Sequence, residues 1–154
     1  MAHVLSEDAK LYYNFTATHG GAGTYTTPDW DEISNVKDLT LTLDKGEIDV
    51  SVRSGNGFAE FVDGLIDATV DFQMLWDTAD VPFSDIQAAF FAKNEVEILV
   101  LDGASTSSGA QGLRVTCMVK SFSRSETLGE ALMVDVSLRP VKNSNAAPAW
   151  YTVP

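Results

Sequence analysis

Side chains that commonly perform chemistry are few in this sequence. Among its 154 residues are two histidines, His3 and His19, and one cysteine, Cys117. Neither histidine has the helical or hairpin spacing to acidic residues that a metal site or a catalytic base requires. We therefore interpret both as solvated loop residues. Cys117 alternates with Val115 and Val119, which favours a buried structural thiol over a reactive one.

Two clusters of acidic residues could in principle bind calcium or act as paired carboxylates. One contains Asp29, Asp31 and Glu32, and the other contains Asp77 and Asp80. Neither has the spacing of a defined calcium loop, so a solvated acidic surface is the simpler interpretation. The serines of the later Gly-rich loop lack the Gly-x-Ser-x-Gly pattern of a nucleophile elbow. We predict no catalytic residue, no metal site and no cofactor.

The charge is distributed unevenly along the sequence. The formal net charge is −12. Residues 1–102 hold 19 of the 22 acidic residues against 5 basic ones, net −14, whereas residues 103–154 hold 3 against 5, net +2. Nucleic-acid binding depends on Lys and Arg displacing counterions from phosphates, so an acidic surface repels DNA. The charge distribution therefore argues against a sequence-specific DNA-binding protein.

Length and composition fit one folded domain over residues 1–154, with terminal arms at about 1–9 and 141–154. A hydrophobic fraction of 45% with 10% aromatic residues is typical of a globular protein. No apolar run approaches the roughly 18 residues of a membrane span, and no signal pattern opens the chain. We expect no membrane association, and synthesis and assembly in the cytoplasm. Trp150 and Tyr151 are costly to leave in water, so we expect the second arm to dock, with a neighbouring subunit as one candidate.

Alternation of apolar and polar residues predicts a mainly β fold. Seven segments have this period of two: residues 11–15, 39–43, 48–52, 68–76, 96–100, 113–119 and 132–138. The short polar stretch at residues 44–47 is typical of a hairpin turn between the second and third segments. One segment departs from this rhythm, because Phe83, Ile86 and Phe90 are spaced by three and four residues. We predict a short α-helix over residues 82–92, capped by Asp80 or Ser84 and packed against the sheet.

The fourth segment has the sharpest difference between its two faces. Its apolar row can fill the core: Ala68, Val70, Phe72, Met74 and Trp76. The same alternation turns a polar row the other way: Asp67, Thr69, Asp71 and Gln73. The pattern identifies an exposed face but leaves open whether this face meets outside solvent or an internal channel.

The order of the segments resembles the major tail tube proteins of long-tailed, siphovirus-like bacteriophages. The likeness covers nearly the whole chain and includes KLYY at residues 10–13, VKDLTLTL at 36–43, the helix at 82–92, FSRSE at 122–126 and LRP at 138–140. It implies a β-sandwich or partly rolled β-barrel with one short flanking α-helix. It also implies a non-enzymatic virion protein, made in the host cytoplasm, whose hexameric rings stack into a hollow tube for DNA.

The resemblance implies several contacts. The polar row Asp67, Thr69, Asp71 and Gln73 becomes a candidate lining of the lumen. Candidate inter-subunit residues are Asp44, Lys45, Gly46, Glu47, Arg53, Asn56, Trp150 and Tyr151. Implied partners are further copies of the chain, the tape-measure protein, a tail-tip or initiator protein and a tail-terminator protein. The alternatives are a tube subunit of a contractile injection machine or gene-transfer particle, or a carbohydrate-binding or adhesion β-sandwich.

Overall fold

The computed structural model describes residues 5–141 and 148–154, so the outermost part of the first predicted arm and residues 142–147 of the second lie outside the described residues. Within these ranges the chain forms eight strands and one α-helix. The strands are β1 (Lys10–Asn14), β2 (Trp30–Glu32), β3 (Val36–Asp49), β4 (Phe61–Leu75), β5 (Val96–Leu101), β6 (Gln111–Ser125), β7 (Met133–Pro140) and β8 (Ala149–Thr152), and the helix is α1 (Val81–Ala92).

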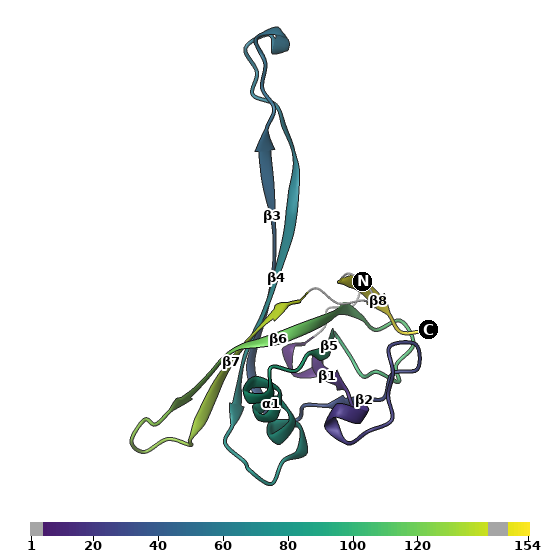
Figure 1. Ribbon diagram of the computed structural model, residues 1–154, viewed down its shortest axis with the longest axis vertical. Coiled ribbons are helices and arrows are strands. Elements are labelled where there is room, and N and C mark those ends of the chain that lie inside the picture. The colour runs from purple at the N-terminus through teal and green to yellow at the C-terminus, as the bar shows by residue number, and fades with distance from the viewer. Residues whose placement is uncertain (1–4, 142–147) are drawn as a thin grey trace.

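The strands form one antiparallel sheet in the order β2-β1-β5-β6-β7-β4-β3, with β8 also paired to β6. The sheet curls around the core without closing, and α1 covers one side (Figure 1). β6 joins the two halves of the sheet, because β5 pairs with it from Gly112 to Cys117 and β7 pairs with it from Cys117 to Ser125. The predicted mainly β fold with one flanking helix is confirmed.

Helix α1 has the predicted start and orientation. The carboxylate of Asp80 accepts a hydrogen bond from the backbone N–H of Phe83 at 3.1 Å, and Pro82 occupies the first turn, where its missing N–H costs nothing. Asp80 is therefore the cap, and Ser84 instead donates to the carbonyl of Thr78. Phe83 and Ile86 are fully buried against the sheet, as the sequence pattern predicts.

The hairpin of β3 and β4 differs from the prediction. Residues 44–47 form no turn, because β3 runs through them as one strand from Val36 to Asp49. The register shifts between Lys45 and Glu47, where Gly46 lies against Gly64 of β4. A bulge thus absorbs this polar, glycine-containing stretch. The chain reverses further on, over residues 50–60, where Asn56 and Gly57 adopt positive φ angles.

Two strands have no counterpart in the sequence prediction. β2 has three residues and β8 has four, which is too short for an alternating pattern to be recognised. β8 brings part of the C-terminal segment onto its own chain: Tyr151 pairs with Gly112, and Val153 is buried. This part of the predicted C-terminal arm therefore belongs to the sheet of its own chain.

Candidate interaction surfaces

The histidine that the structure describes is not a solvated loop residue, so that interpretation was wrong for His19. Its side chain is buried, with Nδ1 3.1 Å from the hydroxyl of Thr16 and the ring edge-on to Tyr13. Burial lowers the pKa of His19. His19 follows β1 in a short 3-10 turn that packs on the core. His3 lies outside the described residues.

The other candidates for chemistry have structural roles. Tyr13 donates a hydrogen bond to Asp85 of α1 at 2.5 Å, and its pKa is raised by burial and by this carboxylate. Asp77 accepts from the backbone N–H of Ala79 just before the helix. Burial raises the pKa of Cys117 to about 12, as expected for a structural thiol. Over residues 5–141 and 148–154, no group of three acidic, histidine or cysteine side chains could hold a metal ion.

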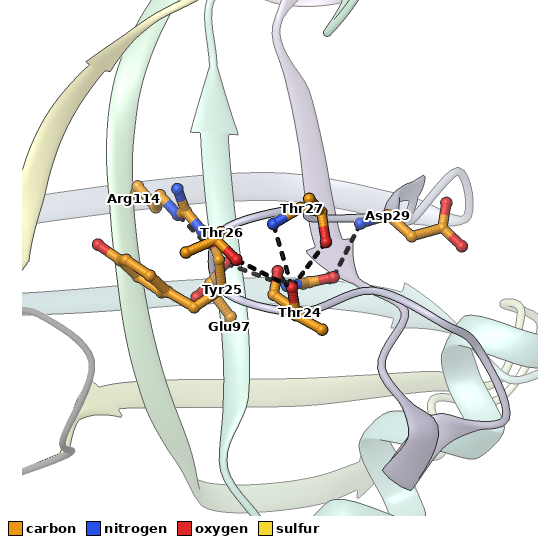
Figure 2. A network of polar contacts seen from close by, with 8 residues as sticks. Thr24, Tyr25, Thr26, Thr27, Asp29, Glu97 and Arg114 are labelled. Atoms are coloured by element: carbon orange, nitrogen blue, oxygen red, sulfur yellow. Dashed lines mark hydrogen bonds and ion pairs between the residues drawn. The ribbon is translucent and has the colours of Figure 1, made fainter.

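A polar network fixes the loop between β1 and β2. Figure 2 shows Arg114 of β6 beside Glu97 of β5, with Nη2 2.7 Å from Oε1, and the same nitrogen donates to the carbonyl of Tyr25 at 2.6 Å. The guanidinium also lies over the Tyr25 ring, 4.1 Å from its centroid. Asn14 holds the loop from the other side, by donating to Thr24 and accepting from Asp29. Arg114 and Glu97 therefore neutralise each other within the chain, and the network anchors the loop between β1 and β2.

One long segment lies outside the core. It is the distal part of the β3–β4 hairpin, residues 43–66, which we call the arm. Figure 1 shows that the arm extends away from the rest of the molecule, which we call the body. Nine large apolar side chains on it are 43% to 91% exposed: Leu43, Ile48, Val50, Val52, Phe58, Phe61, Val62, Leu65 and Ile66. So many exposed apolar residues on one segment indicate an interaction surface.

The predicted inter-subunit residues fall into two separate groups. Lys45 and its neighbours at residues 44–47 lie at the base of the arm, and Arg53 and Asn56 lie at its tip. Trp150 and Tyr151 lie on β8, beside β6 of the body. Trp150 is 60% exposed, although its indole N–H donates to the side chain of Gln111. Contact of either group with another subunit stays a prediction.

The fourth predicted strand has the expected two faces. Its apolar row is buried except for Trp76, which follows the strand and is partly buried: Ala68, Val70, Phe72 and Met74. The register of the sheet extends the polar row across neighbouring strands, because Asp71 pairs with Thr40 and Ser137, and Gln73 pairs with Asp135. We call this the polar face: Lys37, Thr40, Asp67, Thr69, Asp71, Gln73, Ser121, Asp135, Ser137 and Arg139.

Two cations interrupt the acidic character of the polar face. Lys37 of β3 pairs with Gln73 in the register of the sheet. Arg139 of β7 lies beside Asp67, with Nη2 2.7 Å from Oδ2 and 2.9 Å from Oδ1. Both side chains are substantially exposed, so this ion pair adds little to stability. It does neutralise the single arginine of this surface. Sequence reasoning missed Arg139, because its partner lies 72 residues away.

Comparisons with known proteins give a consistent fold. No protein-family model and no curated protein matches the sequence. A chain of the virion of a native gene transfer agent particle matches with a TM-score of 0.71 and 13% identity, covering 98% of this chain and 100% of that one. A chain of the tail of an empty gene transfer agent particle, refined with C6 symmetry, matches with a TM-score of 0.69 and 17% identity over 95% and 100%.

Two further structures extend this likeness. The SPP1 tail tube matches with a TM-score of 0.68 and 10% identity, covering 91% of this chain and 77% of that one. A chain of the anti-feeding prophage baseplate, symmetrised six-fold, matches with a TM-score of 0.63 and 9% identity over 99% and 98%. The chain thus has the fold that the resemblance to tail tube proteins predicts. In the described part of the chain, no helix is long and apolar enough to cross a membrane.

Proposed function

We propose that the chain is a non-enzymatic structural subunit that assembles into stacked hexameric rings and forms the hollow tail tube of a phage or gene-transfer particle. The observation that carries this proposal is the arm, whose apolar side chains the chain itself leaves exposed. The shared fold with the gene transfer agent tail and the SPP1 tail tube supports it. The six-fold symmetry of that gene transfer agent tail supports rings of six.

The arm supports assembly with further copies in particular. The arm extends away from the body (Figure 1) and its apolar side chains are exposed, so the described part of the chain does not cover them. Burying one large aliphatic or aromatic side chain contributes roughly 1.5–3 kcal/mol, and several together offset the entropy lost on association. A projection on one end that binds a different surface on the next copy gives a head-to-tail contact, and such contacts build open stacks.

Free strand edges support ring formation. β3 is the last strand in the order of the described sheet. β7 pairs with one edge of β6. Along the other edge, β5 pairs only as far as Cys117, so among the described residues no strand lies beside this edge from Met118 onward. Pairing β3 of one copy with this part of β6 in the next would cover both edges and continue the sheet around a ring.

The polar face suits the lumen of such a tube. It carries Asp67, Asp71 and Asp135 against Lys37 and Arg139, and Arg139 is already paired with Asp67. A wall with an excess of acidic residues repels a passing polyanion, whereas an excess of Lys or Arg would hold phosphates at every ring. On this proposal DNA passes without sequence recognition. In the alternative, the polar face meets outside solvent. Charge reversal at Asp67 and Asp71 distinguishes the two positions.

The remaining partners follow from this role. A tube of defined length needs a tape-measure protein, an initiator or tail-tip protein and a terminator, so we propose these as partners. We also propose that the protein is part of the virion tail and is assembled in the host cytoplasm. The likeness to the anti-feeding prophage baseplate keeps a contractile injection machine as the second candidate. A carbohydrate-binding module is less well supported, because exposed Phe58 and Phe61 lie on the arm and Trp30 is half-buried in the body.

Negative-stain microscopy of the purified chain tests the assembly. We expect rings or tubes at high protein concentration, or after addition of an initiator. Light scattering across the same concentrations should show growth of large particles. A compact monomer at every concentration, even with initiator present, would contradict the proposed function.

Charge reversal on the polar face tests the lumen. The double variant Asp67→Lys with Asp71→Lys should still form tubes, because both side chains lie away from the core. It also leaves Arg139 unpaired, so the lumen should retain DNA in a salt-dependent way and genome delivery should fall. Asp67→Asn with Asp71→Asn is the matched control. Normal delivery by the lysine variant would exclude a lumen position.

A further inference from the structure

A groove at the C-terminal end of α1 offers a second surface for assembly. It is lined by Ala89, Phe90, Lys93, Met118 and Val119, together with Asn94, Glu95 and Val141. Apolar side chains extend from it onto the surface: Met118 is 46% exposed, and Phe91, edge-on to Phe90, is 72% exposed. The groove therefore combines an apolar floor with an exposed aromatic rim.

Charge distinguishes this groove from two others on the molecule. The groove between β1 and β3 contains Glu7, Glu32 and Asp38 with one lysine. The groove on the polar face contains Asp38, Asp71 and Asp135. The groove at α1 instead has Lys93 against Glu95. Lys120 follows two residues after Met118, and neither lysine forms an ion pair with a described residue.

The arm has the complementary character. Residues 43–66 carry five acidic residues against two basic ones, a net charge of −3, beside their nine exposed apolar side chains. An acidic apolar hairpin is repelled by the two grooves that have an excess of acidic residues, whereas the groove at α1 balances Lys93 against Glu95 and does not repel it. Of the three grooves, the one at α1 is therefore best suited to the arm by its charge and its apolar lining.

The shape of the molecule makes this contact intermolecular. In Figure 1 the arm extends upward from the body, whereas α1 lies in the lower part of the body. The arm points away from its own groove, so one copy cannot close the contact on itself. Two copies stacked along the direction of the arm bring the arm of one toward the α1 side of the other.

We propose that the groove at α1 receives the arm of a second copy, with Phe91 and Met118 covered by the apolar side chains of the arm. This inference rests on the proposed tube function and names the surface through which successive rings hold together. Leu65, which is 91% exposed, is the best probe on the arm side. Lys93 contributes the attraction for the acidic residues of the arm.

Cysteine cross-linking tests the contact directly. Native Cys117 is fully buried and does not interfere. Copies with Leu65→Cys are mixed with copies carrying Phe91→Cys, assembled and oxidised, so any new disulfide joins different molecules. We expect a dimer band that forms in tubes and is absent at concentrations too low for assembly. Leu128→Cys, fully exposed at the end of the β6–β7 hairpin, replaces Phe91→Cys as the control.

The outcomes separate this inference from the proposed function. Tubes that form without the Leu65–Phe91 disulfide, or that form the Leu65–Leu128 disulfide equally well, overturn the groove and leave the tube intact. Absence of tubes from the unmodified chain overturns both. As a second measurement, Lys93→Glu should slow elongation about tenfold at low salt and less at high salt, with Lys93→Arg unchanged. Equal elongation of the two variants counts against the groove.

Discussion

One strand passes through two very different environments in this molecule. In the body, Val70 and Phe72 of β4 are buried by α1 and the rest of the core. A few residues earlier on the same strand, Leu65 and Ile66 are 91% and 71% exposed on the arm. The residue types are alike, so sequence composition does not separate the two regions. Apolar residues on a strand indicate that a surface is to be buried, but they do not indicate which molecule buries it.

Ionic contacts differ between the two regions in the same way. In the body, Glu97 and Arg114 are nearly enclosed and share further hydrogen bonds with the loop before β2. On the arm, Lys45 and Asp63 lie 3.3 Å apart, and at least half of each side chain is exposed. Exposed pairs contribute about 0–1 kcal/mol. The body is thus held by its own contacts, whereas the side chains of the arm make few contacts with the rest of the described chain.

The largest expected effect comes from replacing matched phenylalanines in the two regions. Phe83→Ala removes a fully buried ring and should lower the free energy of unfolding by about 3–5 kcal/mol. Phe58→Ala removes a ring that is 76% exposed on the arm and should change monomer stability by less than about 0.5 kcal/mol. Urea denaturation of unassembled protein measures both. Sedimentation should show that Phe58→Ala nonetheless weakens tube formation, and equal losses of stability would remove the distinction between body and arm.

The C-terminal segment tests where the body ends. Val153 is buried, and its backbone exchanges hydrogen bonds with Gly109 and Ala110. Removing residues 148–154 should therefore lower the free energy of unfolding by at least about 2 kcal/mol, as for other losses from a core.

Trp150→Ala is the matched control, because this side chain is mostly exposed. The monomer should remain stable, and if Trp150 contacts a neighbour, assembly should lose about 1–3 kcal/mol. A truncated chain as stable as the full one would assign β8 to the interface and not to the body.

Two glycines at the start of the arm allow a smaller and more local test. A Cβ on Gly64 would lie 2.9 Å from the backbone of Gly46, whereas a Cβ on Gly46 would lie 3.8 Å from its nearest neighbour. Gly64→Ala should push the strands apart at a cost of about 1–3 kcal/mol, and so redirect the arm and weaken tube growth. Gly46→Ala should be tolerated. Hydrogen exchange of the arm amides measures the distortion, and identical exchange in both variants would show that this close contact does not set the direction of the arm.

The smallest effect on stability is expected from a change of chemical reactivity. Phe58→Cys places a thiol on the exposed arm, whereas Cys117 is buried with its pKa raised to about 12. At pH 8 a maleimide should label the new thiol rapidly in the monomer and slowly in tubes, and should leave Cys117 unlabelled in both. Equal labelling of monomer and tube would place the tip of the arm outside the interface.

Much of the body could be predicted from the sequence because its signals are local. Period-two alternation identified the core strands, and spacings of three and four with Asp80 and Pro82 identified α1. The alternation of β4 also identified the polar face. By contrast, the solvated interpretation of His19 failed, because its burial depends on how the 3-10 turn after β1 packs against Tyr13, which residue spacing alone does not show.

The sequence by itself determined the fold class, the start of α1 and the two faces of β4, since each depends on residues within a few positions of one another. Only the tertiary structure decided that residues 44–47 form a bulge and not a turn, because the close approach of Gly46 and Gly64 depends on strand pairing. The tertiary structure also decided that the alternating residues Ile48, Val50 and Val52 remain exposed. Their periodicity is that of a face to be buried, but residues 5–141 and 148–154 provide no surface that buries it.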